Sequence, residues 1–388
     1  MTAHSSAARR PRRVPASPAA ILAQASAVAL VAAALLLVAV STAANLQARG
    51  LPLGLEFLGD RAGFKIADTV LPFGPEDTYL QAIGVAVANT VFLSALVCVA
   101  ATLIGTALGV ARLSANPLVA GLAAVWVEAM RNTPPVLLLI FLYAYWGQVM
   151  PVGGARELLP GLLVSIRGVG APRLVAEWPL LGLAGALAAG AAIYGAAALA
   201  GRAAARRGRP RPHRAAAAGV IVLGALAAFA IHPPLRLEMP AATGDDLTGG
   251  ARLTPEFATV FAGLTVYTAA FIAEIVRSGV QSVPRGQWEA ARALGLKERQ
   301  ILRLVAFPQM LRVIVPPMTS QYINTVKNST LAIAIGYSEF MTVMGTVINR
   351  TNHPIEGTLI IVLVYLALNL ALAALLDLYN RRVQLEGR

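Results

Sequence analysis

A polar face inside an otherwise apolar run is the feature of this sequence best suited to handling a small molecule. The run Val313–Gly336 carries polar side chains at Asn324, Lys327 and Asn328. In an α-helix, steps of four and three residues place Asn324, Asn328 and Leu331 on one face, and the Lys327 amine could bind a carboxylate. Transporters place substrate sites at polar or broken helices in the membrane, so we expect these residues to line a substrate path. The alternative is a helix buried among others, with its amides hydrogen-bonding between helices.

Two adjacent prolines, Pro316 and Pro317, lie near the start of the same run. Proline has no backbone N–H and its ring clashes with the preceding turn of a helix. We therefore expect a bent helix whose free carbonyl groups can bind water or a ligand.

The stretch Arg277–Arg312 carries too many charges to cross a membrane, yet its pattern is helical. Pro284 favours a helix start and Gly295 a helix stop. A second amphipathic run begins after this stop and ends at Pro308. The stretch is therefore predicted to form two helices joined by a turn on the cytoplasmic side.

The first of these helices carries Glu289, followed by two small residues, Ala290 and Ala291. Side by side on the helix, the two alanines leave little steric bulk where another surface could approach. A plain amphipathic connector resting on lipid headgroups is the alternative interpretation.

One carboxylate, Glu274, lies within an apolar run that ends at Val276. An ionisable group at membrane depth is unfavourable and suggests a function. Glu274 either pairs with Arg277, three residues further along the same helical face, or has a gating or coupling role.

The sequence offers no catalytic constellation, metal site or cofactor motif. The four histidines are dispersed, Cys98 is alone in an apolar run, and no G-x-x-x-x-G-K-[ST] phosphate-binding loop occurs. If transport consumes ATP, hydrolysis must take place on a separate polypeptide.

The composition indicates a membrane protein, since 57% of the 388 residues are hydrophobic and only 13% are charged. The net charge of +13 could suggest a nucleic-acid partner, but the arginines cluster in short segments beside apolar runs. That distribution follows the positive-inside rule for membrane proteins, so no nucleic-acid partner is expected. Three arginines do not follow the rule, because the predicted topology places them on the outer side of the membrane: Arg156, Arg167 and Arg173.

Eight runs are long and apolar enough to be spanning helices, with the third and fifth short and the seventh unusually polar. They are Ala20–Ala44, Val85–Val110, Pro134–Met150, Trp178–Ala200, Ala215–Ile231, Phe257–Val276, Val313–Gly336 and Leu359–Tyr379. The first is either a retained anchor or a cleaved signal peptide.

Several motifs together resemble one family of membrane proteins. Glu289-Ala290-Ala291, with Gly295 four residues later and Pro308 closing the segment, resembles the EAA signature of permeases in binding-protein-dependent ABC transporters. The resemblance implies that Glu289, Ala290, Ala291, Gly295 and Pro308 belong to a coupling loop that docks on a cytoplasmic ATPase.

Further motifs resemble those of the polar amino-acid permeases. Arg131, Thr133 and Pro134 lie in an R-N-T-P-P sequence, Glu274 in an A-E-x-x-R segment, and Lys327 opens K-N-S-T-L. The N-terminal extension and an inserted hairpin resemble the larger permeases of general L-amino-acid transporters. A structural or gating role for Arg131, Thr133, Pro134 and Glu274 is implied.

The resemblance implies an all-α polytopic fold of the type I ABC importer class in a bacterial inner membrane. Implied partners are cytoplasmic ABC ATPase subunits, a second similar permease forming a heterodimer, a periplasmic amino-acid-binding protein and the amino-acid substrate. An ion-gradient-driven secondary transporter of small polar solutes is the alternative, although that class usually shows more intramembrane carboxylates or histidines.

The expected organisation follows from the spans and the resemblance. It comprises a basic cytoplasmic tail (1–19), a spanning helix (20–44), a periplasmic loop (45–84), a permease domain (85–382) with an inserted hairpin (178–231) and a cytoplasmic coupling loop (277–312), and a cytoplasmic tail (383–388).

Overall fold

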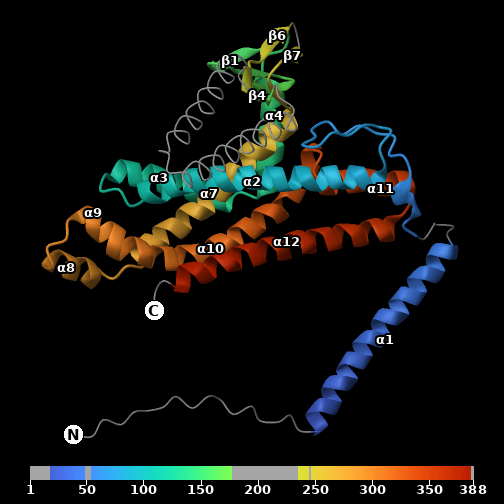
Figure 1. Ribbon diagram of the computed structural model, residues 1–388, viewed down its shortest axis with the longest axis horizontal. Coiled ribbons are helices and arrows are strands. Elements are labelled where there is room, and N and C mark those ends of the chain that lie inside the picture. The colour runs from blue at the N-terminus through green and yellow to red at the C-terminus, as the bar shows by residue number, and fades with distance from the viewer. Residues whose placement is uncertain (1–17, 49–53, 177–234, 244–245, 386–388) are drawn as a thin grey trace, which may run out of the picture.

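The computed structural model describes residues 18–48, 54–176, 235–243 and 246–385. Within them the chain is mostly helical, as predicted (Figure 1). The predicted hairpin at 178–231 lies outside the described residues, as does nearly all of the basic tail at 1–19.

Five described helices are long and apolar enough to cross a membrane, or six if one bent pair forms a single span. The long helices are α1 (Pro18–Ala48), α2 (Tyr79–Ala111), α7 (Pro255–Gln281), α10 (Phe307–Asn328) and α12 (Pro354–Leu385). The shorter ones are α3 (Pro117–Asn132), α4 (Pro135–Val149), α8 (Arg285–Ala293), α9 (Glu298–Ile301) and α11 (Phe340–Thr351). Six of the predicted spans thus overlap described helices, and the other two fall in 178–231.

The third predicted span corresponds to a helix that is too short to cross a membrane by itself. Helix α4 has 15 residues, about 22 Å at 1.5 Å per residue, whereas a bilayer core is about 30 Å thick. Helix α3 precedes it at a bend of 104°. The pair is therefore a broken span or a re-entrant segment.

Helices α2 and α7 pack closely through two glycines of α2. A methyl group at Gly105 would lie 2.7 Å from the carbonyl oxygen of Ala269, and one at Gly109 would lie 2.7 Å from that of Ala273. Such contacts are too short for a real side chain. The G-x-x-x-G spacing in the sequence thus marks the site where the two backbones approach.

Residues 54–78, which we call the strap, form a folded segment with its own secondary structure. The strap contains the short helix η1 (Glu56–Gly59), and an antiparallel bridge pairs Arg61 with Thr78. Thr78 and Gln81 form a capping box that starts α2 at Tyr79. The last residues of the predicted periplasmic loop, 79–84, therefore belong to α2.

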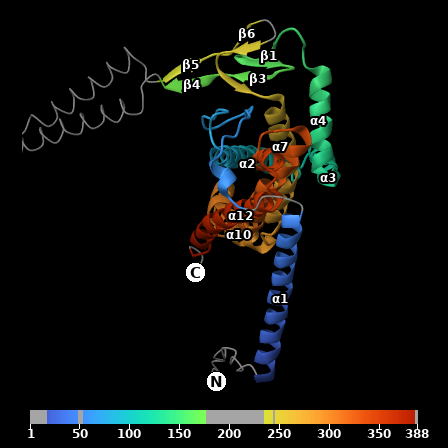
Figure 2. The same ribbon diagram turned by 90° about the vertical axis from the view of Figure 1, so that its right-hand side faces the viewer.

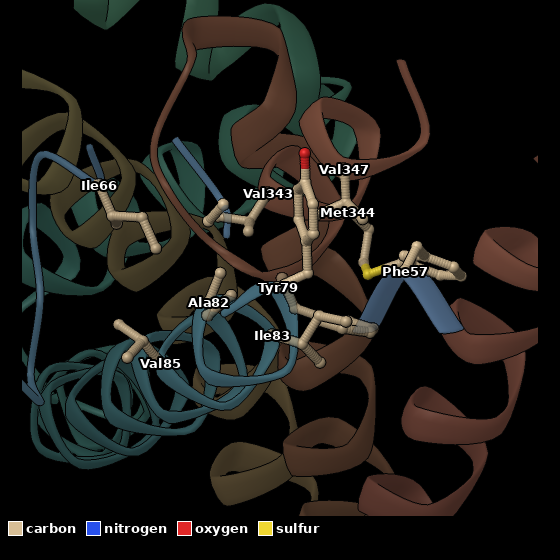
Figure 3. Close-up of a cluster of buried hydrophobic side chains, with 12 residues drawn as sticks. Phe57, Ile66, Tyr79, Ala82, Ile83, Val85, Val343, Met344 and Val347 are labelled. Carbon is tan, nitrogen blue, oxygen red and sulfur yellow. The ribbon is translucent and has the colours of Figure 1, made fainter. Parts of the chain in front are cut away.

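A buried apolar cluster joins the strap to α2 and α11 (Figure 3). Phe57 and Ile66 of the strap meet Tyr79 of α2 and Met344 of α11 in this cluster. The ring of Phe57 also stacks on His353 at 4.5 Å between centroids. The strap and α11 thus share one core at the opposite end of the bundle from α8 and α9 (Figure 1).

A small β region lies beyond the ends of α4 and α7 (Figure 2), and the sequence did not predict it. A four-stranded antiparallel sheet has the order β1-β2-β3-β8, and two further pairs are β4-β5 and β6-β7. The strands are β1 (Arg156–Leu159), β2 (Leu162–Ser165), β3 (Gly168–Ala171), β4 (Arg173–Ala176), β5 (Leu235–Glu238), β6 (Ala241–Thr243), β7 (Asp246–Thr248) and β8 (Ala251–Leu253).

The β region accounts for arginines that ran against the positive-inside rule. Arg167 lies 3.9 Å from the Asp246 carboxylate, and Arg252 lies 3.1 Å from it. These charges belong to a polar surface module with its own ion pairs. Arg156 and Arg173 lie in strands of the same module.

Pro316 and Pro317, where a bend is predicted, lie inside one continuous helix. Helix α10 continues as an α-helix through both prolines, and the chain changes to a 3₁₀-helix, η3 (Ser329–Ile335), only after Asn328. Upstream, the π-helical segment η2 (Leu302–Ala306) connects α9 to α10.

Candidate functional site

The loop between α7 and α10 folds as two short helices, as predicted. Helix α8 ends in a Schellman motif: the N–H of Leu296 donates to the Ala291 carbonyl (3.2 Å), and that of Gly295 donates to the Arg292 carbonyl (2.9 Å). Gly295 has φ +75°, a left-handed conformation that favours glycine. The helix stop at this residue is thus confirmed.

The exposed face of α8 differs from the prediction. Glu289 and Ala290 are exposed, but Ala291 is only 4% exposed and faces the protein. The two alanines therefore do not form one open surface. The residue that follows α8, Leu294, is 81% exposed, and it offers the apolar contact that the sequence analysis overlooked. Its exposure depends on the turn, so the sequence pattern alone carried no signal for it.

Helix α8 is fixed to the base of α10. Trp288 packs against a cluster formed by Val283, Ala306 and Met310. Pro308, predicted to end the second helix, instead lies in the first turn of α10, directly after the π-helical segment η2. Helix α8 and the start of α10 are therefore in direct contact.

Glu274 lies in an ion-pair network rather than in a single pair. It accepts hydrogen bonds from Arg277, with 3.1 Å to Nε, and from Arg112 at the end of α2. Glu128 of α3 lies 3.9 Å from Arg112 and 3.8 Å from Arg131. The pair with Arg277, one of the two alternatives for Glu274, is present, and the network joins the ends of α2, α3 and α7.

The residues of the R-N-T-P-P motif form the corner between α3 and α4. Thr133 ends α3 and donates its hydroxyl to the Ala129 carbonyl (2.8 Å), and Pro134 precedes the first residue of α4. The guanidinium of Arg131 lies over the Phe271 ring of α7, 5.6 Å from its centroid. The motif thus sets the bend and anchors it to α7.

The predicted path residues fall into two groups. Asn324 and Lys327 are exposed and Asn328 is partly exposed. Leu331 instead packs against a buried cluster that contains Ala332 and Leu139. Leu331 lies in the 3₁₀-helix that begins at Ser329, where a step of three residues still keeps side chains on one face, so its alignment with Asn328 stays a prediction.

A cavity of about 900 Å³ lies between α2, α7 and α10, near α8. Its lining is mostly apolar, and its hydroxyl groups are those of Thr102, Thr106, Ser114, Thr319 and Tyr322. The hydroxyl oxygens of Thr102 and Tyr322 lie 2.9 Å apart. The predicted path residues of α10 are not among its lining residues in the described chain. The cavity and the exposed polar residues therefore occupy different faces of α10.

Comparison with known proteins gives the family. Residues 220–385 match the family described as "Binding-protein-dependent transport system inner membrane component". The chain is 39% identical to the general L-amino acid transport system permease protein AapQ of Rhizobium johnstonii, over 90% of this chain and 88% of that protein. The chain belongs to this family of permeases.

A second relative supports the same assignment. The permease is 34% identical to the glutamate/glutamine/aspartate/asparagine transport system permease protein BztB of Rhodobacter capsulatus, over 89% of this chain and 88% of that protein.

The permease is thus a multi-pass inner-membrane component of a binding-protein-dependent ABC system, in which the ATPase is a separate component. Family membership also overturns the alternative of an ion-gradient-driven secondary transporter.

Proposed function

We propose that the permease carries amino acids and that the exposed polar face of α10 lines their path. Both relatives are named as amino-acid permeases, one for general L-amino acids and one for four acidic or amide amino acids. A zwitterion requires polar partners in the membrane, and Asn324 and Lys327 supply an amide and an ammonium group.

The observation that carries this proposal is the exposure of α10. Ser320, Asn324 and Lys327 are exposed on a helix within a candidate membrane span. Polar and charged side chains do not remain against lipid tails, so they face protein or a water-filled path. Exposure in the single chain therefore indicates a surface that a second subunit covers.

That second subunit is proposed to be a similar permease, so that two polar faces enclose one path in a heterodimer. A periplasmic binding protein delivers the amino acid to this path from outside. The ATPase docks on the coupling loop, 277–312, through Glu289, Ala290 and Leu294. Ala291, Gly295 and Pro308 set the conformation of this loop.

Thiol labelling tests the path. Cys98 is first replaced by Ser, and single cysteines are then placed at Asn324 or Asn328 in the assembled transporter. Because a path is hydrated, a small membrane-impermeant thiol reagent should label both positions, and substrate or nucleotide should change the labelling rate by about fivefold, a typical coupling between sites.

The matched control is Leu370→Cys, since Leu370 is 61% exposed on the apolar helix α12 and should resist a polar reagent. Ala332 is unsuitable as a control because it is fully buried. Labelling at Leu370 with none at Asn324 and Asn328 would show that the polar face is packed, and the path would then lie elsewhere.

A further inference from the structure

One buried amide connects two segments that are far apart in the sequence. Asn89 of α2 is fully buried. Its Nδ2 donates to the backbone carbonyls of Asp68 (2.6 Å) and Ser338 (2.9 Å), and its Oδ1 accepts from the N–H of Val70 (3.0 Å). A single side chain thus holds the strap and the chain after η3 at the same point.

The segment after η3 is the connection between the proposed path helix and α11. We call residues 336–339 the hinge, since Gly336 has a left-handed φ of +79° at which the chain leaves the 3₁₀-helix. Two backbone groups fix this connection to α2: Ser338 through Asn89, and the N–H of Phe340 through the Thr90 hydroxyl (3.0 Å). The path helix therefore ends against α2.

The far side of the hinge is fixed by a buried carboxylate. Glu339 is fully buried and caps α11, accepting from the N–H of Thr342 (2.8 Å) and from the hydroxyl of Tyr365 on α12 (2.8 Å). The hinge thus cannot shift without moving α11.

Helix α11 in turn carries the strap. Phe57 and Ile66 of the strap pack in one apolar cluster with Val343 and Met344 of α11, as Figure 3 shows. The strap N–H of Gly54 also donates to Glu356 at the start of α12 (2.9 Å). Hinge, α11 and strap are therefore joined by buried contacts into one unit.

A second anchor connects the strap to α7. The Thr254 hydroxyl donates to the Asp68 carboxylate and accepts from the N–H of Phe257, which caps α7. Burial raises the pKa of Asp68. The carboxylate and the backbone of Asp68 thus contact α7 and α2 respectively, within one residue of the exposed Thr69.

We propose that Asn89 is a positioning residue that makes the strap move with the outer end of the path helix. A conformational change in the path then changes the exposed surface of the strap, which a protein outside the membrane can contact. This inference rests on the proposed role of α10. Without the Asn89 amide, only the apolar contacts through α11 still join the hinge to the strap, so a movement of the hinge reaches the strap only in part.

A reporter at Thr69 tests the inference in the full transporter. Thr69→Cys is made with Cys98 replaced by Ser, and the complex with its own ATPase is compared without nucleotide and after trapping with ATP and vanadate. The reaction rate with a membrane-impermeant maleimide should differ about fivefold between the two states. In Asn89→Ala the difference should become clearly smaller, because only the contacts through α11 remain, while complex assembly and basal ATP hydrolysis persist.

Two further variants separate coupling from folding. Asn89→Leu fills nearly the same space but has no donor for the carbonyls of Asp68 and Ser338, so it should also reduce the difference. Ser94→Ala is the matched control: Ser94 is buried on the same helix, and its hydroxyl has no hydrogen-bond partner among the described residues, so the difference should persist.

The outcomes are distinct. A difference that keeps its parent size in both Asn89 variants, or that is absent in the parent, overturns the inference, as does failure of both variants to assemble. Asn324→Cys, labelled in the same two states, identifies which proposal has failed. A response at Asn324 without one at Thr69 removes only the Asn89 inference, whereas no response at Asn324 removes the proposed path and the inference with it.

Discussion

At the scale of single residues, the conformation of one glycine determines how α8 is presented. Gly295 adopts φ +75° with nothing within 4 Å of where a side chain would begin. Space is therefore available, and only the backbone disfavours a larger residue. For an L-residue the left-handed conformation costs about 1–2 kcal/mol.

We expect Gly295→Val to uncouple transport from ATP hydrolysis while the permease still reaches the membrane. A β-branched residue strains the turn and reorients Leu294 and Glu289. Co-purification with the ATPase is the measurement, and it should fall together with uptake. Gly286→Val is the control, since Gly286 is exposed on the same helix with free space around it. Unchanged ATPase binding in Gly295→Val would favour a plain connector.

A second residue-scale prediction concerns pH. Burial raises the pKa of Glu339 above its ordinary value of 4.5, although hydrogen bonds from Met341, Tyr365 and Thr342 oppose the shift. The folded protein therefore binds this proton more tightly than the unfolded chain does. The contribution to stability is complete below pH 4.5 and is lost as the pH rises through the raised value.

Glu339→Gln should accordingly flatten the pH dependence of the melting temperature, because the amide cannot ionise. Purified permease is heated at pH values from about 4 upward, and the slope of melting temperature against pH should be smaller than in the parent. Glu56→Gln replaces an exposed carboxylate of the strap and should leave the slope unchanged. Equal slopes in the parent and Glu339→Gln would mean that the carboxylate stays ionised.

At the scale of elements, the α2–α7 pair is the most tightly packed part of the bundle, and we expect it to move as a rigid unit. Its two glycines allow close approach of the backbones, and the network around Glu274 joins the same helices at one end. The coupling loop follows α7 directly, so displacement of α8 reaches a rigid pair on one side and α10 on the other.

Gly105→Ala should destabilise the permease by about 1–3 kcal/mol, the usual cost of overpacking, because the new methyl group meets the Ala269 backbone. Thermal unfolding in detergent is the measurement. Gly84→Ala lies on the same helix with open space around it, and it should be neutral or slightly stabilising, since alanine favours helix over glycine by about 1 kcal/mol. A melting temperature for Gly105→Ala as high as that for Gly84→Ala would contradict close packing.

Sequence reasoning succeeded where the signal was local and failed where tertiary packing decided. Gly295 ended α8 as expected, because a left-handed helix end favours glycine through its own backbone. Pro316 and Pro317 lie inside α10, which continues as one α-helix through them, although proline disfavours a helix interior. Leu331 packs against a buried cluster that contains Ala332 and Leu139, a tertiary contact that helix periodicity does not reveal.

At the scale of the whole molecule, the family and the main spans were predictable from the sequence because motif spacing and apolar length survive divergence. The β region and the strap were not. The strands of the β region have three or four residues. Strand β3 pairs with β8, which follows the segment 177–234 in the sequence. Such non-local contacts leave no periodic signal. The Asn89 amide was hidden for the same reason, since its partners lie 21 and 249 positions away.

The β4–β5 ladder has a consequence for the segment between its strands. Ala176 pairs with Leu235 and Arg173 with Glu238, so the chain enters and leaves residues 177–234 at adjacent points on one hairpin stem. Because both ends of residues 177–234 are fixed next to each other, a change in the length of this segment during evolution need not displace α4 or α7. The β4–β5 ladder is thus a position at which the sequence can vary in length while the arrangement of the spanning helices is kept.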